Sequence, residues 1–564
     1  MVGKHFFHRD PAGVMLALLC CAGTQTAALA EPAPALEHAT LTITAATDPD
    51  PLSPEQLEQL DTVLGDIRIR NGDIFDENDP EENGLFYRIA NTLHIQTREN
   101  VIRRQLLVHS GDPYTQDAIA ETERLLRTNK YIQTAEIRPI QLENGEVDLE
   151  VLTEDTWTLS PQISFSHKGG ASTGGFEFEE ANLLGTGSDV KIGYKSRVER
   201  NQAYFGYRDN QLGASRMQLD LSTARADDGS SYRLLLEQPF YALNARRAGG
   251  VFIESFDQVD PLYQLGEVYD EVRHDVRRFE VFHGWSEGLV HDHVSRYKIG
   301  LGYDAHSFDA VDDMQISPYA PADRRDVYPF VAWEWLENHF EQTRNADNIA
   351  RIEDRFLGSR VAARLGYAST ALGSDDDAWV YALDAQRSAR LFGDTLMLHG
   401  GLRGRQASRD PDSYRFETGA RWYHRQSPKR LLYAELSGAV AEQPDTDEQL
   451  TIGGDNGLRG YPMRYQAAKA VAILTLEQRF YTDWYPFRLF RVGAVMFADV
   501  GRAWGVYGTP DADLGLLRDV GVGLRIGNSR SSRGSMLHID VAYPLDGPAD
   551  IRHAQFILET SSSF

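Results

Sequence analysis

A glycine-rich stretch that carries one arginine, Gly453–Pro462, has the residue types best suited to a specific ionic contact. Arg459 is followed by Gly460 and Tyr461. Glycines at this density let a backbone turn tightly, with positive φ where a turn needs it. Taken alone, the stretch could be a surface turn with an incidental arginine.

Two acidic residues further along the chain give this arginine candidate partners. Glu477 lies in Leu-Thr-Leu-Glu-Gln-Arg-Phe, and Asp499 lies in Phe-Ala-Asp-Val-Gly. Both segments look like strands. A planar guanidinium suits two-pronged pairing with carboxylates. The combination predicts a latch, in which a loop folds back into a barrel and Arg459 holds it there.

Other chemistry-bearing clusters are weaker. His291-Asp292-His293 and the acidic runs Asp375–Asp377 and Asp445–Glu448 are the best candidates for a barrel enzyme, such as a protease or phospholipase. We interpret them as charged loop tips. The sequence contains no recognisable nucleophile setting, H-E-x-x-H motif or phosphate-binding glycine loop. We therefore expect no enzyme activity, no catalytic residue, no metal site and no cofactor.

The first thirty residues read as a secretory signal peptide. A basic start with Lys4 and Arg9 precedes the apolar run 14–22, and small residues follow at Ala28 and Ala30. The apolar run is too short for a spanning helix. Both cysteines of the chain lie in this segment, so we expect no disulfide in the mature protein.

Charge and composition narrow the class of protein. The net charge of −26 argues against nucleic acid as a partner. No later apolar run approaches the roughly 20 residues of a membrane helix, yet aromatic residues make up 10% of the chain and glycines number 48. Short aromatic-rich segments of this kind fit a transmembrane β-barrel.

Residues 31–60 are rich in proline, alanine and glutamate and predict a linker. Residues 61–155 predict a small β-α-α-β-β module. Its elements are a strand near Ile67, a helix over 98–107 with Thr97 as N-cap, a helix from Thr115, and a hairpin around Asn144-Gly145. Apolar residues of the second helix form a stripe along one face.

From Trp157 to Phe564 the pattern changes to short alternating segments. In 190–195 and 297–303, apolar residues take one face and Lys or Gly the other. Further segments run through 216–223, 230–238, 394–404, 431–441 and 535–543. Apolar residues outward and polar residues inward are what lipid outside and a wet lumen require. The pattern predicts a transmembrane antiparallel β-barrel of up to about 20 strands.

Short and long connections alternate along this region. Short turns at 183–187, 238–241, 426–429 and 529–532 belong on the periplasmic side, and long loops at 306–326 and 442–469 belong outside. By this parity the loop with Arg459 starts on the outer side, from where it could fold into the lumen.

Several motifs together resemble the POTRA-plus-barrel superfamily of outer-membrane assembly and secretion proteins, whose members include BamA, TamA, D15-like surface antigens and the two-partner secretion transporters. The motifs are Leu458-Arg459-Gly460-Tyr461, Phe497-x-Asp499-x-Gly501, Glu180-x-Asn182-x-x-Gly185-x-Gly187 and the terminal Phe564. The resemblance covers about residues 60–564.

The resemblance implies that Arg459 packs inside the barrel against Asp499 and Glu477, with Gly460 and Tyr461 completing the loop motif. It also implies 16 strands, fewer than the pattern count. The family's POTRA modules are thought to bind extended peptides at a sheet edge, so residues on the predicted hairpin, Tyr131 and Ile137, are candidate client contacts. This chain has one such module, where relatives usually have more.

The expected function is protein insertion or protein transport at the outer membrane of a Gram-negative bacterium, with the N-terminal domain in the periplasm. A seam between the first strand, near Ile163 and Phe165, and the last, near Phe556 to Phe564, would open to template a new strand or pass a chain. Expected partners are unfolded outer-membrane or secreted polypeptides and outer-membrane lipids, with periplasmic chaperones or accessory lipoproteins as further candidates.

The alternative is a two-partner-type secretion transporter for one large exported protein, with the lumen as conduit. A passive pore or a barrel enzyme is a weaker alternative, because a pore leaves the N-terminal module unexplained.

Overall fold

The structure of the protein, a computed structural model, describes residues 53–143, 145–311, 315–349, 351–506, 513–530 and 536–561. The predicted signal peptide, most of the predicted linker, Asn144 and Phe564 lie outside these residues. No helix within them is both long and apolar enough to cross a bilayer.

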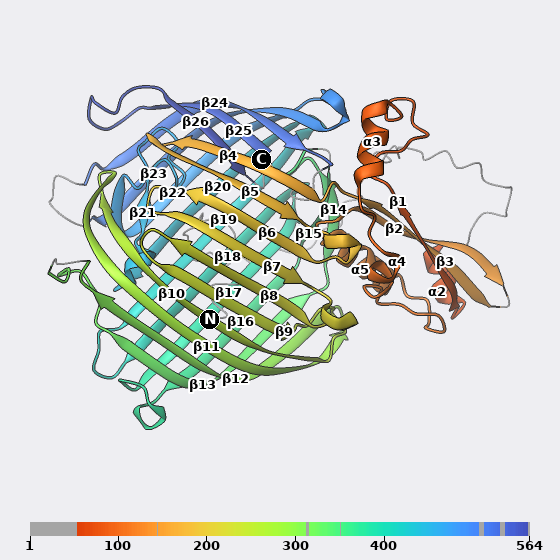
Figure 1. Ribbon diagram of the computed structural model, residues 1–564, viewed down its shortest axis with the longest axis horizontal. Coiled ribbons are helices and arrows are strands. Elements are labelled where there is room, and N and C mark those ends of the chain that lie inside the picture. The colour runs from red at the N-terminus through yellow and green to blue at the C-terminus, as the bar shows by residue number, and fades with distance from the viewer. Residues whose placement is uncertain are drawn as a thin grey trace.

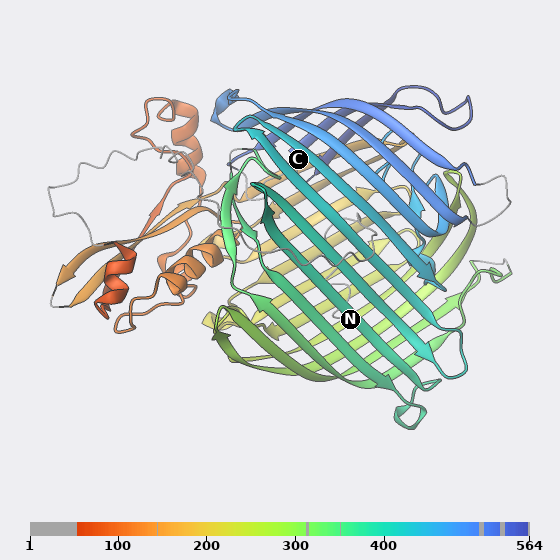
Figure 2. The same ribbon diagram turned by 180° about the vertical axis from the view of Figure 1, so that it is seen from behind.

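One closed antiparallel barrel dominates the described part of the chain, with a small module against one end (Figures 1 and 2). The wall strands are β4 (Leu159–Lys168), β5 (Ala171–Glu180), β6 (Asp189–Ser196), β7 (Asn201–Asp209), β8 (Gln218–Ala226), β9 (Ser230–Gln238), β10 (Arg247–Gln264), β11 (Glu267–Val290), β12 (His293–Asp309), β13 (Arg324–Glu337), β16 (Ser359–Ala368), β17 (Ala378–Leu391), β18 (Asp394–Ala407), β19 (Ser413–Ser427), β20 (Arg430–Glu442), β22 (Gln466–Tyr481), β23 (Phe490–Val506), β24 (Leu516–Asn528), β25 (Met536–Pro544) and β26 (Gln555–Ser561). A two-residue strand, β21 (Thr451–Ile452), pairs with the start of β22.

The described residues thus form a wall of 20 long strands. The count from alternation is confirmed, and the 16 strands implied by the resemblance are wrong for this chain. The physical reason is unbroken local pairing: each long strand bonds to the next without a gap, and β20 bonds directly to β22 beside β21. Sheet closure tolerates a range of strand numbers, because diameter grows with the count.

Alternation places side chains as the sequence predicts. On β12, Tyr297, Ile299 and Leu301 are exposed on the outer face. Lys298 lies between them and faces Phe282, with its ammonium 4.5 Å from the ring centroid. The outer face of the wall is therefore apolar, and the inner face carries the charged residues.

The N-terminal module contains a three-stranded sheet with the order β1-β3-β2. Its strands are β1 (Val63–Gly72), β2 (Ile132–Glu143) and β3 (Glu146–Asp155), and its helices are α2 (Pro54–Gln59), α3 (Leu85–Leu93), α4 (Glu99–Arg103) and α5 (Gln116–Arg127). β1 runs parallel to β3, and β2 antiparallel. The predicted hairpin and second helix are present, and Leu126, Leu149 and Val151 are fully buried in the module core.

Two local expectations are wrong. α2 lies within the stretch expected to be linker, because Ser53 and Gln56 form a capping box that starts a short helix. Thr97 does not cap the next helix: its backbone N–H donates to Asp155 and its hydroxyl accepts from Asn182 of the barrel. A tertiary contact thus replaces the local cap, and α4 begins at Glu99 after Arg98.

Short turns lie at the module's end of the barrel, in agreement with the predicted parity. Gly185 accepts a backbone bond from Arg98 of the module, and Arg530 bonds to Ile74 and Glu82. The long connection 443–465, with the 3-10 turn η4 (Thr446–Glu448), leaves the opposite end.

A hairpin inserted between β13 and β16 was not predicted. It consists of β14 (Phe340–Arg344) and β15 (Ile352–Phe356), which pair only with each other and lie at the module's end of the barrel (Figure 1). Its tip residues Ala346 and Ile349 are buried among inward-facing side chains such as Tyr433 and Phe497. The hairpin therefore enters the lumen from the module side.

Candidate functional site

Arg459 lies inside the barrel and bonds to both predicted carboxylates. Its Nε and Nη2 donate to the two oxygens of Asp499 at 2.8 and 2.9 Å, and its Nη1 donates to Glu477 at 2.8 Å. The guanidinium carbon lies 3.5 Å from the centroid of the Phe497 ring. Asp499 is fully buried. The planar cation is thus clamped on its edge by acids and on its face by an aromatic ring.

Glycine is required beside this arginine because the loop approaches the wall closely. A Cβ on Gly460 would lie 2.7 Å from Asp519 Cβ and 3.0 Å from the Pro544 nitrogen. On β23, a Cβ at Gly501 would lie 2.9 Å from Leu458 Cδ1. The small residues of the two motifs therefore fit one another across the gap between loop and wall.

Tyr461 anchors the loop on its other side. Its side chain is fully buried, and its hydroxyl donates to the Arg518 carbonyl at 2.9 Å and accepts from the Arg518 N–H at 3.1 Å. Leu458 is equally buried, in a cluster with Ile452 and Leu517. Loop and wall thus form one packed unit around Arg459.

The ionic network continues from this loop to the hairpin at the other end of the lumen. Glu477 accepts from Arg459 and also from Arg479 Nε at 2.9 Å. Arg479 Nη1 donates to the Ala346 carbonyl at 2.9 Å and lies 3.5 Å from Asp347 Oδ1. Two segments that enter from opposite ends therefore share one carboxylate–arginine chain.

The hairpin in turn is bonded to the N-terminal module. Arg127 at the end of α5 donates from Nε and Nη2 to both oxygens of Asp354, at 2.8 and 2.7 Å. The Arg124 guanidinium lies 3.7 Å from the Phe340 ring centroid. A continuous set of contacts thus joins module, hairpin, barrel wall and outer loop.

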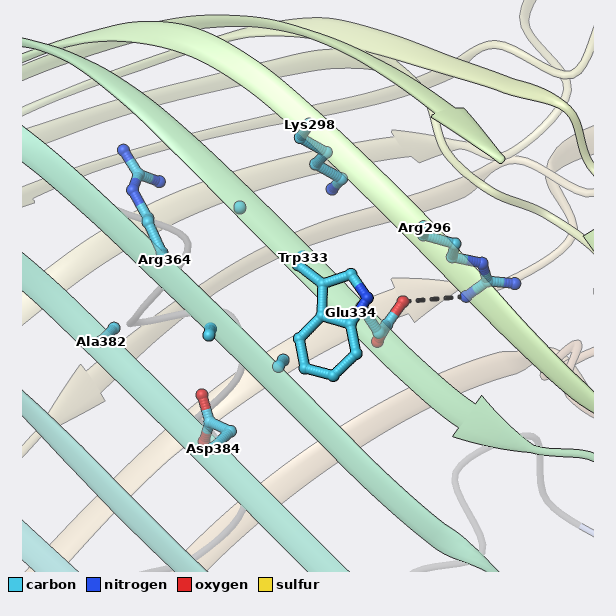
Figure 3. A pocket seen from close by; sticks show the side chains of 10 residues that line it. Arg296, Lys298, Trp333, Glu334, Arg364, Ala382 and Asp384 are labelled. Atoms are coloured by element: carbon cyan, nitrogen blue, oxygen red, sulfur yellow. Dashed lines mark hydrogen bonds and ion pairs between the residues drawn. The ribbon is translucent and has the colours of Figure 1, made fainter. Parts of the chain in front are cut away.

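A hollow in the wall lies on strands β12, β13, β16 and β17, lined by alanines and charged side chains (Figure 3). Arg296 donates to Glu334 at 3.0 Å, and Arg364 donates to Glu280 at 2.8 Å. Ala332 and Ala382 leave the space between these pairs. The surface of the hollow is mostly apolar, and charged side chains, among them Lys298 and Asp384, lie around it.

The first and last strands of the barrel, which carry the predicted seam residues, lie side by side. Phe165 on β4 and Phe556 on β26 are both about half exposed. Between these strands the ladder of described residues has one residue pair, His167 with Leu558. Lys168 and Glu559 add an ion pair at 2.8 Å.

Neighbouring ladders are much longer. β25 and β26 pair from Met536 with Ser561 to Ala542 with Gln555. β4 and β5 pair along the whole of both strands. Among the described residues, the closing contact is therefore the shortest ladder between neighbouring wall strands.

The predicted client contacts are wrong as side-chain contacts. Tyr131 and Ile137 are buried in the module core, and the Tyr131 hydroxyl accepts from Gln105. Alternation along β2 turns Ile137 inward, so the exposed face of β2 carries charged residues such as Arg138. The backbone edge of β2 is also covered: Glu123 accepts from the Ile137 N–H at 2.7 Å, and Arg127 donates to the Ala135 carbonyl at 2.8 Å.

The clusters considered for catalysis lie apart. His291 and Asp292 form the tight β11–β12 turn with positive φ, and Asp375–Asp377 form an outer loop with Arg325 and Arg409. Asp445–Glu448 are different, because η4 lies against the barrel wall, where Asp445 pairs bidentately with Arg324.

Sequence reasoning missed the hairpin with Asp347 and Asp354, the bridging Arg479, and Arg127. The sequence did contain a signal for the hairpin. The run Arg-Asn-Ala-Asp-Asn has residue types that are common in turns, and the segments on either side of it carry Phe340 and Phe356 at their outer ends. Arg479 lies two residues after Glu477, so on a strand both side chains point to the same face of the sheet, which here is the inner face. No local signal links Arg127 to Asp354.

Comparisons with known proteins describe shape only. The chain matches no protein-family model and no curated protein sequence. Solved structures similar to it include BamA from Haemophilus ducreyi lacking POTRA domains 1–3 (14% identity, 88% of this chain and 85% of that chain, TM-score 0.38). They also include CdiB from Escherichia coli (11% identity, 89% of this chain and 77% of that chain, TM-score 0.47). A third is the FrpB iron transporter from Neisseria meningitidis (8% identity, 89% of this chain and 92% of that chain, TM-score 0.39). With TM-scores below 0.5, these likenesses say nothing about which activity the chain has.

Proposed function

We propose that this chain is an outer-membrane protein that inserts or translocates polypeptides and needs no nucleotide. The observation that carries the proposal is the seam: within the described part of the chain, β26 and β4 share one residue pair, and β4 is the strand that follows the N-terminal module. The apolar outer face supports a membrane location, because a barrel in lipid must present apolar side chains outward.

A weak seam suits a strand-exchange function. Every backbone group at an open edge in lipid is costly, so a seam that opens must exchange its bonds for those of another strand. A short ladder lowers the cost of opening, while the long ladder with β5 keeps β4 in place as a template. An incoming polypeptide would pair with β4 by β-augmentation.

Arrival of a client at the module could be transmitted through Arg127. A peptide that adds to the β2 edge needs the backbone groups of Ala135 and Ile137, which Arg127 and Glu123 now occupy. Displacing Arg127 from this edge also disturbs its bidentate pair with Asp354 of the hairpin. The client would thereby loosen the hairpin that enters the lumen.

A second candidate function is a secretion transporter that uses the lumen as its conduit. The hairpin favours it, because a segment that enters the lumen and is bonded to the N-terminal module has the position of a gate. A passive pore would have no use for that bond.

In-cell photo-crosslinking distinguishes these functions. A photoreactive residue is placed at Phe165 beside the seam, at Arg138 on the exposed face of β2, and at Ala382 in the lumen, with outward-facing Leu383 as the matched control. Capture of many nascent barrel proteins at Phe165 and Arg138 is the result expected for an insertase. One large secreted protein at Ala382 would instead identify a transporter. Capture at no position beyond the Leu383 background would refute both.

A further inference from the structure

Two histidines and several carboxylates meet where η4 touches the barrel wall. Asp260 lies on β10, His274 on β11 and Asp447 on η4, and one donor atom from each lies within 4.8 Å of the others. His274 Nδ1 is 2.8 Å from Asp260 Oδ2 and 4.0 Å from Asp447 Oδ1. His274 and Asp260 are buried, whereas Asp447 reaches solvent.

The hydrogen count along this cluster is one short. His274 Nε2 is 2.9 Å from His306 Nδ1, and His306 Nε2 is 3.1 Å from Asp304 Oδ1. With the Asp260 contact, this makes three successive bonds, each needing a hydrogen. Two neutral imidazole rings carry only two N–H groups. A cation at His274 Nδ1 would remove the deficit, since each ring could then donate in the same direction, toward Asp304.

Arg278 does not resolve the count. Its Nη2 lies 3.3 Å from His306 Nε2, but it could donate there only if that nitrogen carried no hydrogen. The bare nitrogen would then face the Asp304 carboxylate at 3.1 Å, an unfavourable contact between lone pairs. The guanidinium already bonds to Asp304 and to Glu254.

The charges of the cluster also favour a cation. Asp304 pairs with Arg278, and Asp445 pairs with Arg324. Asp260 bonds to the Thr446 hydroxyl at 2.7 Å, to the Gln258 amide at 2.5 Å and to His274, and none of these is a fixed positive charge. A buried carboxylate without a cation is costly.

We propose that Asp260, His274 and Asp447 bind one divalent transition-metal ion of the Zn²⁺ class. One imidazole nitrogen and two carboxylate oxygens suit this ion better than Mg²⁺ or Ca²⁺, which prefer oxygen alone. His306 orients His274 from behind, as partners of metal-bound histidines usually do. The ion fastens the loop of Arg459 to β10 and β11, across the barrel from Asp499. This site is independent of the proposed function.

The test uses the full mature chain, folded in detergent, purified through a tag without histidines and stripped with a chelator. Zn²⁺ alone is titrated by calorimetry, and bound metal is counted after dialysis. We expect one bound ion per chain. Asp447→Asn and His274→Gln should each weaken binding by about 100-fold or more, and His306→Gln by about 10- to 100-fold. His291→Asn, in the exposed β11–β12 turn, is the matched control and should bind as the parent does.

Two outcomes overturn the proposal. One is a folded parent, shown by heat-modifiable mobility, that binds no stoichiometric Zn²⁺. The other is binding by Asp447→Asn equal to that of the parent. Asp447 reaches solvent, so this variant keeps the test valid even if His274→Gln fails to fold.

Discussion

Arg459 joins the loop to two buried acids of the barrel wall, and its removal would take from both the cation that they share. Asp499 and Glu477 are buried, so Arg459→Ala leaves them without their shared partner. The loss should be up to about 3–5 kcal/mol if the site were dry, and less in a wet lumen. The urea midpoint of unfolding in detergent and protease cleavage at Arg464 would measure stability and loop release.

Arg518→Ala is the matched control for Arg459. It removes an arginine whose pair with Asp546 is about half exposed on the arginine side, and such pairs contribute about 0–1 kcal/mol. Arg459→Lys should resemble Arg459→Ala more than the parent, because an ammonium cannot reproduce the two-pronged bond. Equal unfolding midpoints for the Arg459 and Arg518 alanine variants would refute the latch.

Replacing Gly460 by alanine should affect stability through steric overlap alone. Gly460→Ala would bring a Cβ to 2.7 Å from Asp519 Cβ, whereas Gly206→Ala on β7 would meet no atom closer than 3.8 Å. We expect Gly460→Ala to lower the free energy of unfolding by about 1–3 kcal/mol, in the range of overpacked cores. The Gly206 variant should unfold close to the parent in the same assay, and an equal loss in both would contradict the close approach.

At the scale of elements, the hairpin β14–β15 contacts both the N-terminal module and the inner face of the barrel wall. Asp354→Asn removes the carboxylate that Arg127 holds bidentately. If the hairpin closes the lumen, this variant should raise single-channel conductance in planar bilayers, and replacing 340–356 by a short glycine–serine link should raise it further.

Asp375→Asn serves as the control for the hairpin. It breaks an exposed pair with Arg325 on an outer loop, away from the hairpin, and conductance should not change. Parental conductance from the chain without 340–356 would mean that the hairpin does not close the lumen.

At the scale of the whole molecule, the seam decides whether the barrel opens sideways. His167 and Leu558 are direct partners across β4 and β26, and the sequence contains no cysteine after Cys21 that could interfere. A His167→Cys/Leu558→Cys disulfide should abolish client insertion in cells, and a reductant should restore it. The readout is the assembly of the barrel proteins captured at Phe165.

A Val522→Cys/Val541→Cys disulfide is the control, because these residues are partners in the long β24–β25 ladder. It should leave insertion unchanged. If the seam disulfide forms fully and clients still assemble, then the lateral route is wrong and the lumen is the remaining path.

The sequence by itself determined the barrel, its outer apolar face and the partners of Arg459. Strand alternation is a local property with period two, so Tyr297 and Ile299 face outward wherever β12 lies in the wall. The loop motif and the acids of β22 and β23 carried enough chemistry to predict one another. The small module was also readable, apart from the cap at Thr97, where a barrel residue replaced a local bond.

Only the tertiary structure decided the rest, because it depends on contacts between segments far apart in the chain. Arg127 and Asp354 are 227 residues apart, and nothing near either one indicates the other. The histidine cluster unites β10, β11, β12 and η4 only after the barrel closes and the loop turns inward. The pairing at the seam is likewise a property of closure, although the run Thr560-Ser561-Ser562-Ser563 already marks the last strand as irregular in the sequence. Pairing across a closed sheet is set by geometry that no single segment contains.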